Sequence, residues 1–175
     1  MDPLEPIDPV QSFLMKTDTS LEPEGRHDVD PAAPVVLFDM DGTLLHLEVD
    51  IEAARSSLAA FFAPYGYTQP FRPILMRIRE AATLAFQHGV QLNGGLDAFY
   101  RAGLDILDGF EVAASVRDQP GAAALIQGLR ARGVRLGLVT DNGRACVGRA
   151  RARVGIPRGA FEAIATRDDV PTGKP

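Results

Sequence analysis

Two aspartates at the end of an apolar run are the residues of this sequence best placed to do chemistry. Asp39 and Asp41 lie two positions apart in the segment VVLFDMDGTLL at residues 35–45, and Gly42 follows them directly. Residues two apart in an extended chain project to the same side, and glycine lets the backbone turn sharply without a steric penalty. The two carboxylates are therefore held together at the end of the predicted strand, where one can act as a nucleophile and the other as a general acid and base.

An Asp-x-Asp-Gly sequence also occurs in turns and calcium loops, where aspartate and glycine suit the turn geometry. A calcium-binding EF-hand loop needs further oxygen ligands at alternating positions and a glutamate at the twelfth. Counted from Asp39, the seventh and ninth positions are Leu45 and Leu47, and the twelfth is Asp50. The calcium interpretation is therefore weak, and the apolar run before Asp39 argues against a plain surface turn.

The apolar run at residues 35–38 predicts a buried strand. A strand that is apolar at every position is usually covered on both faces, as in a parallel sheet flanked by helices. Segment 134–140 has the character of a second buried strand, segment 161–165 is predicted to form a short third strand, and helical patterns at 122–132 and 143–154 precede them. This alternation predicts right-handed crossovers and an α/β fold with a Rossmann-like parallel sheet, which binds ligands beyond the carboxyl ends of its strands.

The segment from residue 51 to residue 117 predicts helices only. We expect residues 42–50 before it to form a loop. Apolar residues at helical spacing are most simply explained by packing of these helices against one another. The first predicted helix begins near Ile51 and ends by Gly66. The second follows Pro73 and ends by Gly89, and the third runs from about Leu96 to Leu107.

Length and composition fit one globular core with a small accessory element. The chain has 175 residues, of which 46% are hydrophobic. No apolar stretch approaches the roughly 18 residues that a membrane helix needs. The start, MDPLEPIDPV, lacks the basic and apolar regions of a secretory signal. A single cysteine, Cys146, excludes an internal disulfide framework and suits a reducing compartment, so we expect a cytoplasmic protein.

The charge is concentrated at the start of the chain. Residues 1–34 hold eight acidic and two basic residues and six prolines, whereas the rest of the chain has fifteen acidic and sixteen basic residues. A segment with this composition buries too little apolar surface to fold, so we expect a disordered acidic tail. An acidic tail on a nearly neutral body argues against nucleic acid as the main partner.

Polar residues follow all three predicted strands, and their order resembles that of a known family. The first strand is followed by the two aspartates, the second by Thr140, Asp141 and Asn142, and the third by Lys174. The segments VLFDMDGTL, LGLVTDN and GKP resemble the first three motifs of the haloacid dehalogenase superfamily, also called HAD-like hydrolases. The resemblance covers residues 35–175.

The resemblance implies a role for each of these residues. In the family the first aspartate attacks the phosphorus of a phosphate ester and forms an aspartyl-phosphate, a role that falls on Asp39. The second aspartate protonates the leaving alcohol and then activates water, a role that falls on Asp41. Mg²⁺, held by Asp39 and by the backbone carbonyl of Asp41, would offset the repulsion between carboxylate and phosphate together with Lys174 and the Thr140 hydroxyl. The other phosphate-binding positions implied are Gly42, Thr43, Asp141 and Asn142.

Asp41 favours phosphoryl transfer over removal of halide from carbon, because family members that release halide lack this acid/base aspartate. The resemblance therefore implies a Mg²⁺-dependent phosphatase acting on a small phosphorylated metabolite. The charge distribution and the apolar pattern predict neither nucleic acid nor a membrane as partner. A phosphosugar mutase of the same superfamily would use the same residues and stays an alternative. Residues 51–117 match the family's mobile helical cap, inserted into a core of residues 35–50 and 118–175, and the length of this cap suggests a phosphoglycolate-phosphatase-like or sugar-phosphate-mutase-like member.

The fourth motif of the family supplies acidic metal ligands on a later strand, and this chain ends at Pro175, one residue after Lys174. Asp168 and Asp169 precede that lysine, so we expect turn or cap roles for them. In the family the fourth strand lies beside the first, and without it residues 35–38 form an exposed apolar edge that is prone to pairing. The alternatives are a longer natural protein, a partner or second copy that covers the edge, and an inactive fragment acting as a binding module.

Other polar residues are expected to be structural. Cys146 lacks the sequence signature of a catalytic thiol and is expected to be buried. His46, although near the end of the first predicted strand, is expected to be an exposed loop histidine. The arginines at 144, 149, 151 and 153 are expected to form the solvated face of a helix.

Overall fold

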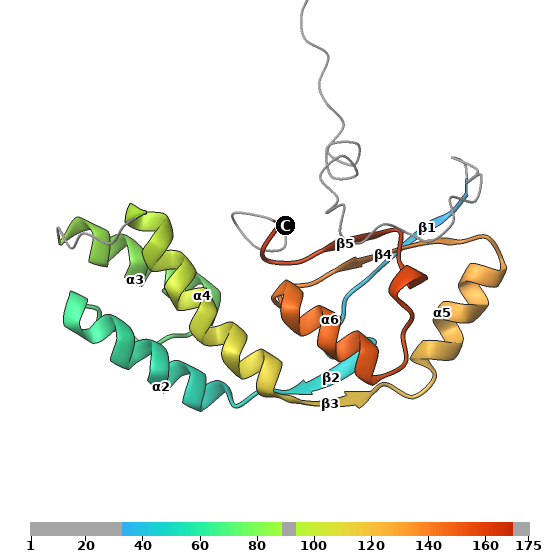
Figure 1. The fold of residues 1–175 in the computed structure, drawn as a ribbon, viewed down its shortest axis with the longest axis horizontal. Coiled ribbons are helices and arrows are strands. Elements are labelled where there is room, and N and C mark those ends of the chain that lie inside the picture. The colour runs from blue at the N-terminus through green and yellow to red at the C-terminus, as the bar shows by residue number, and fades with distance from the viewer. Residues whose placement is uncertain (1–32, 89–93, 170–175) are drawn as a thin grey trace, which may run out of the picture.

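The computed structural model describes residues 33–88 and 94–169, which form a parallel sheet with its helices and a bundle of three further helices (Figure 1). The sheet has the strand order β1-β4-β5, and both pairings are parallel. All three segments are therefore strands, as predicted, but the first is not buried: its alternate residues Val35 and Leu37 are exposed, so one face of the strand is uncovered. Their bounds are Val35–Phe38 for β1, Arg135–Val139 for β4 and Ala163–Ala165 for β5.

The connections between these strands are helical, as the alternating pattern predicts. Helix α5, Ala122–Ala131, leads into β4, and helix α6, Arg144–Arg153, with the short helix η3, Arg158–Ala160, joins β4 to β5. Apolar residues of both longer helices pack with the sheet in one core because each helix turns one stripe inward. The buried members include Ile126, Leu136, Leu138 and Val147.

Residues 42–50 do not form the predicted loop, and the prediction of helices only for residues 51–117 is wrong for residues 115–117, which form part of a strand. Strand β2, Leu45–Glu48, pairs antiparallel with β3, Ser115–Asp118, and this ribbon lies at the end of the helical bundle where the chain enters α2 and leaves α4 (Figure 1). Leu45 is fully buried and Leu47 packs against the core, so the segment has an apolar face that its pairing with β3 orients inward. The two strands carry the chain into and out of the bundle.

The three predicted helices are present and have a hydrophobic core of their own. Asp50 caps the first helix by accepting a hydrogen bond from the Ala53 N–H at 2.9 Å. The short helix η2 then ends at Gly66, whose φ of 86° suits glycine. The bounds are Ile51–Phe62 for α2, Ala63–Tyr65 for η2, Ile74–Gln87 for α3 and Gly95–Ala113 for α4. Fully buried side chains of this core include Leu58, Phe62, Ile78 and Phe99.

Among the described residues, strand β1 lies at the edge of the parallel sheet, as expected, and presents apolar side chains there. Val35 is 58% exposed and Leu37 is 63% exposed. Within the described residues, none of the helices is long and apolar enough to cross a membrane. The predicted tail lies outside the described residues except for residues 33 and 34, and so does Lys174.

Candidate active site

The carboxyl end of β1 carries both aspartates. Asp39 is partly buried, and its Oδ1 accepts a hydrogen bond from the Met40 N–H at 2.8 Å. Asp41 is exposed, and its Oδ1 accepts a hydrogen bond from the Leu47 N–H at 2.9 Å. Gly42 has a φ of 76°, and its N–H donates to the Leu45 carbonyl at 2.8 Å. The turn after β1 therefore folds back onto β2 and fixes the Asp41 carboxylate against that strand.

The carboxyl end of β4 carries the second predicted group. Thr140 is 3% exposed, and its N–H donates to the Ala165 carbonyl of β5 at 2.9 Å. Its hydroxyl donates to Asn142 Oδ1 at 2.8 Å and lies 3.3 Å from the Asn142 N–H, which donates to it. The three residues Thr140, Asp141 and Asn142 thus form a compact loop between β4 and α6, with Asp141 exposed.

The parallel register brings these two groups to the same edge of the sheet. Phe38 pairs with Leu138 in the last matched position of β1 and β4, so Asp39 follows this pair directly and Thr140 follows it after Val139. An edge of this kind, at the carboxyl ends of parallel strands, is where such sheets bind ligands. Thr43 lies in the exposed turn after Gly42. Lys174, the third predicted element, falls outside the described residues.

The donor set at this edge fits Mg²⁺. The described residues include no group of three or more His, Cys, Asp or Glu side chains that could enclose a metal ion. Mg²⁺ does not need such a cage, since it keeps several waters and is usually held by one or two carboxylates together with substrate phosphate oxygens. Asp39 and Asp41 supply hard oxygen atoms of that kind on one exposed turn.

A buried ion cluster lies beside this edge and was not predicted. Arg167 follows β5, and both it and Glu111 of α4 are 5% exposed. The two terminal nitrogens of Arg167 donate to the two Glu111 carboxylate oxygens at 2.6 and 3.0 Å, and Nη2 of Arg167 also pairs with Asp108. Burial alone lowers the pKa of Arg167, but the hydrogen bond and charge of Glu111 and the charge of Asp108 outweigh it, so the pKa is raised.

Asp168 and Asp169 have the expected cap and turn roles. The Arg144 N–H, at the start of α6, donates to Asp168 Oδ2 at 2.8 Å. The Thr166 N–H and hydroxyl both donate to Asp169 Oδ2 at 2.8 Å. Asp168 also forms an ion pair with Arg101 of α4 at 3.3 Å, which the sequence did not suggest.

Two of the structural expectations are wrong. Arg151 is 5% exposed rather than solvated, and its Nη1 donates to the Arg158 carbonyl at 2.9 Å. His46 lies on strand β2 rather than in a loop, is partly buried, and has Nε2 within 2.7 Å of Gln119 Oε1. Both predictions fail because tertiary packing, which the sequence pattern does not show, determines the hydrogen-bond partners of Arg151 and His46.

Cys146 is buried, as expected, at the start of α6. Its Sγ lies 3.7 Å from the Glu111 carbonyl, to which the thiol donates. Burial, and next the charge of Glu111, raise the pKa of this thiol to about 12. A thiol with so high a pKa is a poor nucleophile, which agrees with a structural role.

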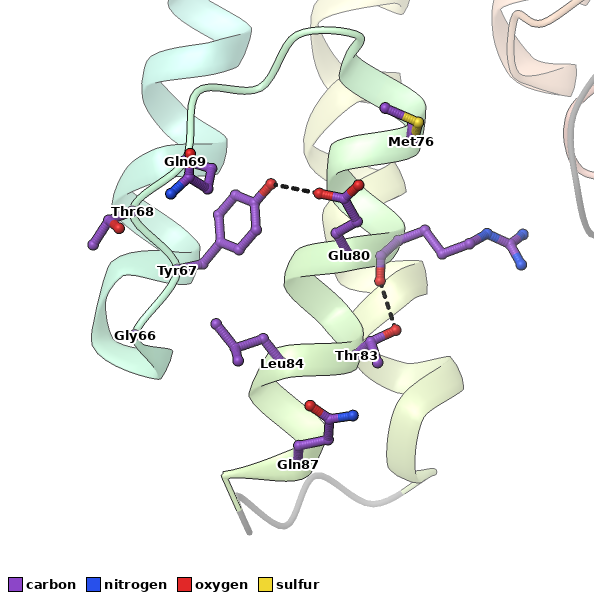
Figure 2. A pocket seen from close by; sticks show the side chains of 10 residues that line it. Gly66, Tyr67, Thr68, Gln69, Met76, Glu80, Thr83, Leu84 and Gln87 are labelled. Atoms are coloured by element: carbon purple, nitrogen blue, oxygen red, sulfur yellow. Dashed lines mark hydrogen bonds between the residues drawn. The ribbon is translucent and has the colours of Figure 1, made fainter.

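Two cavities of the described residues lie away from the two aspartates. One of about 550 Å³ is lined by residues of the loop after η2 and of α3, and Figure 2 shows Tyr67 donating to Glu80 across it at 3.3 Å. Another, of about 250 Å³, lies between the start of α5 and the segment after α6. Neither is lined by a predicted site residue.

Comparisons with known proteins agree with this architecture. A family model described as haloacid dehalogenase-like hydrolase matches residues 33–175. Two phosphoglycolate phosphatases, from two strains of Cereibacter sphaeroides, are each 32% identical to this chain over 154 residues, which is 81% of this chain and 66% of the relatives' length. The chain therefore spans just under two thirds of these relatives.

A solved structure supports the fold. The structure of CbbY from Rhodobacter sphaeroides in complex with phosphate matches with a TM-score of 0.50 and 24% identity, over 81% of this chain and 67% of that one. A likeness at this identity speaks for the fold alone. The family match, by contrast, covers most of the sequence and includes both aspartates. This chain belongs to the haloacid dehalogenase-like hydrolase family.

Proposed function

We propose that this chain carries the nucleophile, the acid/base and part of the phosphate site of a Mg²⁺-dependent phosphatase that acts on a small phosphorylated metabolite. The observation that supports it most is the placement of Asp39 and Asp41 on one turn, beside Thr140 at the end of the neighbouring strand. Because the named relatives are phosphoglycolate phosphatases, phosphoglycolate is the first substrate to test.

In the proposed reaction, Asp39 attacks phosphorus and the bond from phosphorus to the leaving oxygen breaks. Asp41 gives its proton to that oxygen, then takes a proton from the water that hydrolyses the aspartyl-phosphate, so Asp39 is regenerated and inorganic phosphate leaves. The hydrogen bond from the Leu47 N–H orients the Asp41 carboxyl group for both steps. The Asp39 carboxylate and the Asp41 backbone carbonyl would hold Mg²⁺, which would supply positive charge for the transferring phosphoryl group.

The phosphate is held, in this proposal, by donors from both strand ends. Gly42 and Thr43 contribute from the turn after β1, and Thr140, Asp141 and Asn142 contribute from the loop after β4. Fixed donors aimed at the transferring oxygens act more strongly than mobile ones because they need no reorganisation during the reaction. Lys174 is assigned to the same anion as a further positive charge.

The helices form the proposed cap. Residues 51–117 serve as the cap, and residues 35–50 and 118–175 serve as the core. The separate hydrophobic core of α2, α3 and α4 supports this division, since a cap that moves must hold together by itself. The free thiol of Cys146 fits the proposed cytoplasmic location.

The test is hydrolysis of p-nitrophenyl phosphate and of phosphoglycolate by the purified 175-residue chain, with and without Mg²⁺. We expect release of inorganic phosphate that needs Mg²⁺ and is abolished by Asp39→Asn. Asp105→Asn, at an exposed carboxylate of α4, is the matched control and should leave turnover unchanged. Undiminished turnover by Asp39→Asn would refute the nucleophile. Absence of multiple turnover in the wild-type chain would favour a binding module.

A further inference from the structure

Arg167 lies outside the predicted motifs and uses both terminal nitrogens of its buried guanidinium group in polar contacts, while its Nε has no hydrogen-bond partner among the described residues. Its side chain is 3% exposed. One terminal nitrogen, Nη1, donates to Glu111 Oε1 at 2.6 Å and to the Asp141 carbonyl at 2.9 Å. The other, Nη2, donates to Glu111 Oε2 at 3.0 Å and pairs with Asp108. Paired contacts from a planar guanidinium fix both direction and distance, which a lysine ammonium does not.

These contacts converge on the loop between β4 and α6. Besides the side-chain bond to the Asp141 carbonyl, the backbone N–H of Arg167 donates to the Asn142 carbonyl at 3.4 Å. Glu111, which Arg167 holds in place, accepts from the Gly143 N–H at 3.0 Å. Three consecutive residues of the loop are therefore tied to one buried ion cluster.

Gly143 shows how closely the cluster approaches the loop. A Cβ atom at this position would lie 2.3 Å from Asp108 Oδ1 and 3.1 Å from Arg167 Nη2. The backbone φ of −68° is ordinary, so glycine is required here by space and not by conformation. Only the smallest residue lets the carboxylate and the guanidinium reach the start of α6.

Both carboxylates of the cluster come from the proposed cap. Asp108 and Glu111 lie one turn apart on α4, which passes beside α6 (Figure 1). The thiol of Cys146 donates to the Glu111 carbonyl on the same side. The cluster thus joins a helix that begins in the bundle to the loop that follows β4.

We propose that Arg167 is a positioning residue for the phosphate site: through the Asp141 carbonyl and through Glu111 it holds the loop of Thr140, Asp141 and Asn142 in the conformation that receives the substrate phosphate. The proposal rests on the proposed function, because it assigns that loop to phosphate binding. Donors that are held in place before substrate arrives bind the anion without an ordering cost, and a displacement of about 1 Å reduces catalysis by about a hundredfold.

The experiment compares two substitutions at this position with a matched buried arginine. Arg167→Met removes every hydrogen bond and ion pair of the side chain, and Arg167→Lys keeps the charge but loses the paired hydrogen-bond geometry. Arg151→Met is the control, since Arg151 is equally buried at 5% exposure but contacts the Arg158 carbonyl and not the loop. Affinity for orthovanadate in Mg²⁺ is measured by calorimetry, and amide exchange of residues 140–147 by mass spectrometry.

We expect Arg167→Met to weaken vanadate binding about tenfold or more, Arg167→Lys to weaken it less, and both to speed exchange in residues 140–147. Arg151→Met should lower the melting temperature yet leave vanadate affinity within about twofold of wild type. If Arg167→Met does not fold, Arg167→Lys and Glu111→Gln test the proposal by the same two measurements, vanadate affinity and amide exchange of residues 140–147.

Two results separate the failure of this proposal from the failure of the proposed function. Folded Arg167 variants with wild-type affinity and wild-type exchange in residues 140–147 would overturn the positioning role. A wild-type chain that binds no vanadate, and is not inhibited by it, would instead overturn the phosphate site. In that case unchanged loop exchange in Arg167→Lys still refutes the claim that Arg167 orders the loop.

Discussion

The Asp41 carboxylate shows how one hydrogen bond can prepare a residue for two opposite steps. Its Oδ1 accepts from the Leu47 N–H at 2.9 Å while the side chain stays exposed. An exposed carboxylate can exchange protons with solvent between the two steps, and a backbone donor limits its rotation. The proton is needed most when the leaving oxygen is a poor leaving group.

Asp41→Asn should therefore affect two substrates differently. With phosphoglycolate, whose leaving group is an alkoxide, we expect the rate of phosphoryl transfer to fall by about two to three orders of magnitude. With p-nitrophenyl phosphate, whose leaving group needs no proton, a burst of p-nitrophenolate should persist and later turnover should slow. Rapid-mixing measurements of both substrates check this. Equal losses in the first step for both would contradict the acid role.

Cys146 gives a prediction about pH and stability. The folded chain raises the pKa of this thiol from its ordinary value of 9.0 to about 12. Because the raised pKa means that the folded state holds the proton more tightly, its contribution to stability is complete below pH 9. It is lost as pH rises toward 12, at about 1.4 kcal/mol per pH unit in that window.

The measurement is urea unfolding at a series of pH values from 8 to 11 for the wild-type chain and for Cys146→Ala. The variant lacks the thiol but keeps every other titrating group. The difference between the two free energies of unfolding should therefore shrink as pH rises above 9. A difference that stays constant over this range would show that the thiol titrates alike in both states.

At the scale of elements, the packing of α3 against α4 depends on a single glycine. A Cβ at Gly103 would lie 2.5 Å from Ile78 Cγ2 and 3.2 Å from the Phe62 ring, whereas a Cβ at Gly109 of the same helix has nothing within 4 Å. Gly103→Ala should lower the free energy of unfolding by about 1–3 kcal/mol through overpacking. Gly109→Ala should raise it by about 0.5–1 kcal/mol, because alanine favours the helix.

Denaturant unfolding followed by circular dichroism checks this pair. The two variants carry the same substitution in the same helix, so helix propensity cancels in the comparison and only the local space differs. Stabilisation by both would mean that α3 and α4 do not approach as closely as the structure has them.

Elements whose signal is local were predictable from the sequence. Strand β1 is a continuous apolar run, β4 is apolar after Arg135, and α5 has Pro120 and Gly121 before it and Gly133 after it. Strand β2 was not predicted, because it is short and its partner β3 follows only after the three helices of the bundle. For such a strand the deciding information is the pairing, which periodicity does not contain.

The residues of the candidate site also divide into those that the sequence predicts and those that depend on tertiary contacts. Asp39, Asp41 and Thr140 follow predicted strands, so the parallel register alone brings them to one edge. The cluster of Arg167 with Asp108 and Glu111 was missed because it joins residues 59 and 56 positions apart. A buried ion pair between residues so far apart in the chain produces no regular spacing in the sequence that would reveal it. The apolar stripe of α4 predicted the helix but not the direction of its acidic residues.

At the scale of the whole molecule, the edge of the parallel sheet is the feature that most affects behaviour in solution. Strand β1 has a sheet neighbour only on the side of β4 among the described residues, and Leu37 on it is 63% exposed. An apolar edge with unpaired backbone groups is a template for pairing with another chain, and a charged residue on the edge opposes this.

Leu37→Lys should therefore reduce self-association of the 175-residue chain while keeping its fold. Leu125→Lys is the matched control, since Leu125 is 50% exposed but lies on helix α5, whose backbone groups are already paired. Sedimentation velocity over a range of concentrations should show less oligomer or aggregate for Leu37→Lys, and little change for Leu125→Lys. If both variants behave alike, general surface hydrophobicity and not strand pairing governs association. If neither differs from a monomeric wild type, the edge of β1 is not open to pairing in this chain.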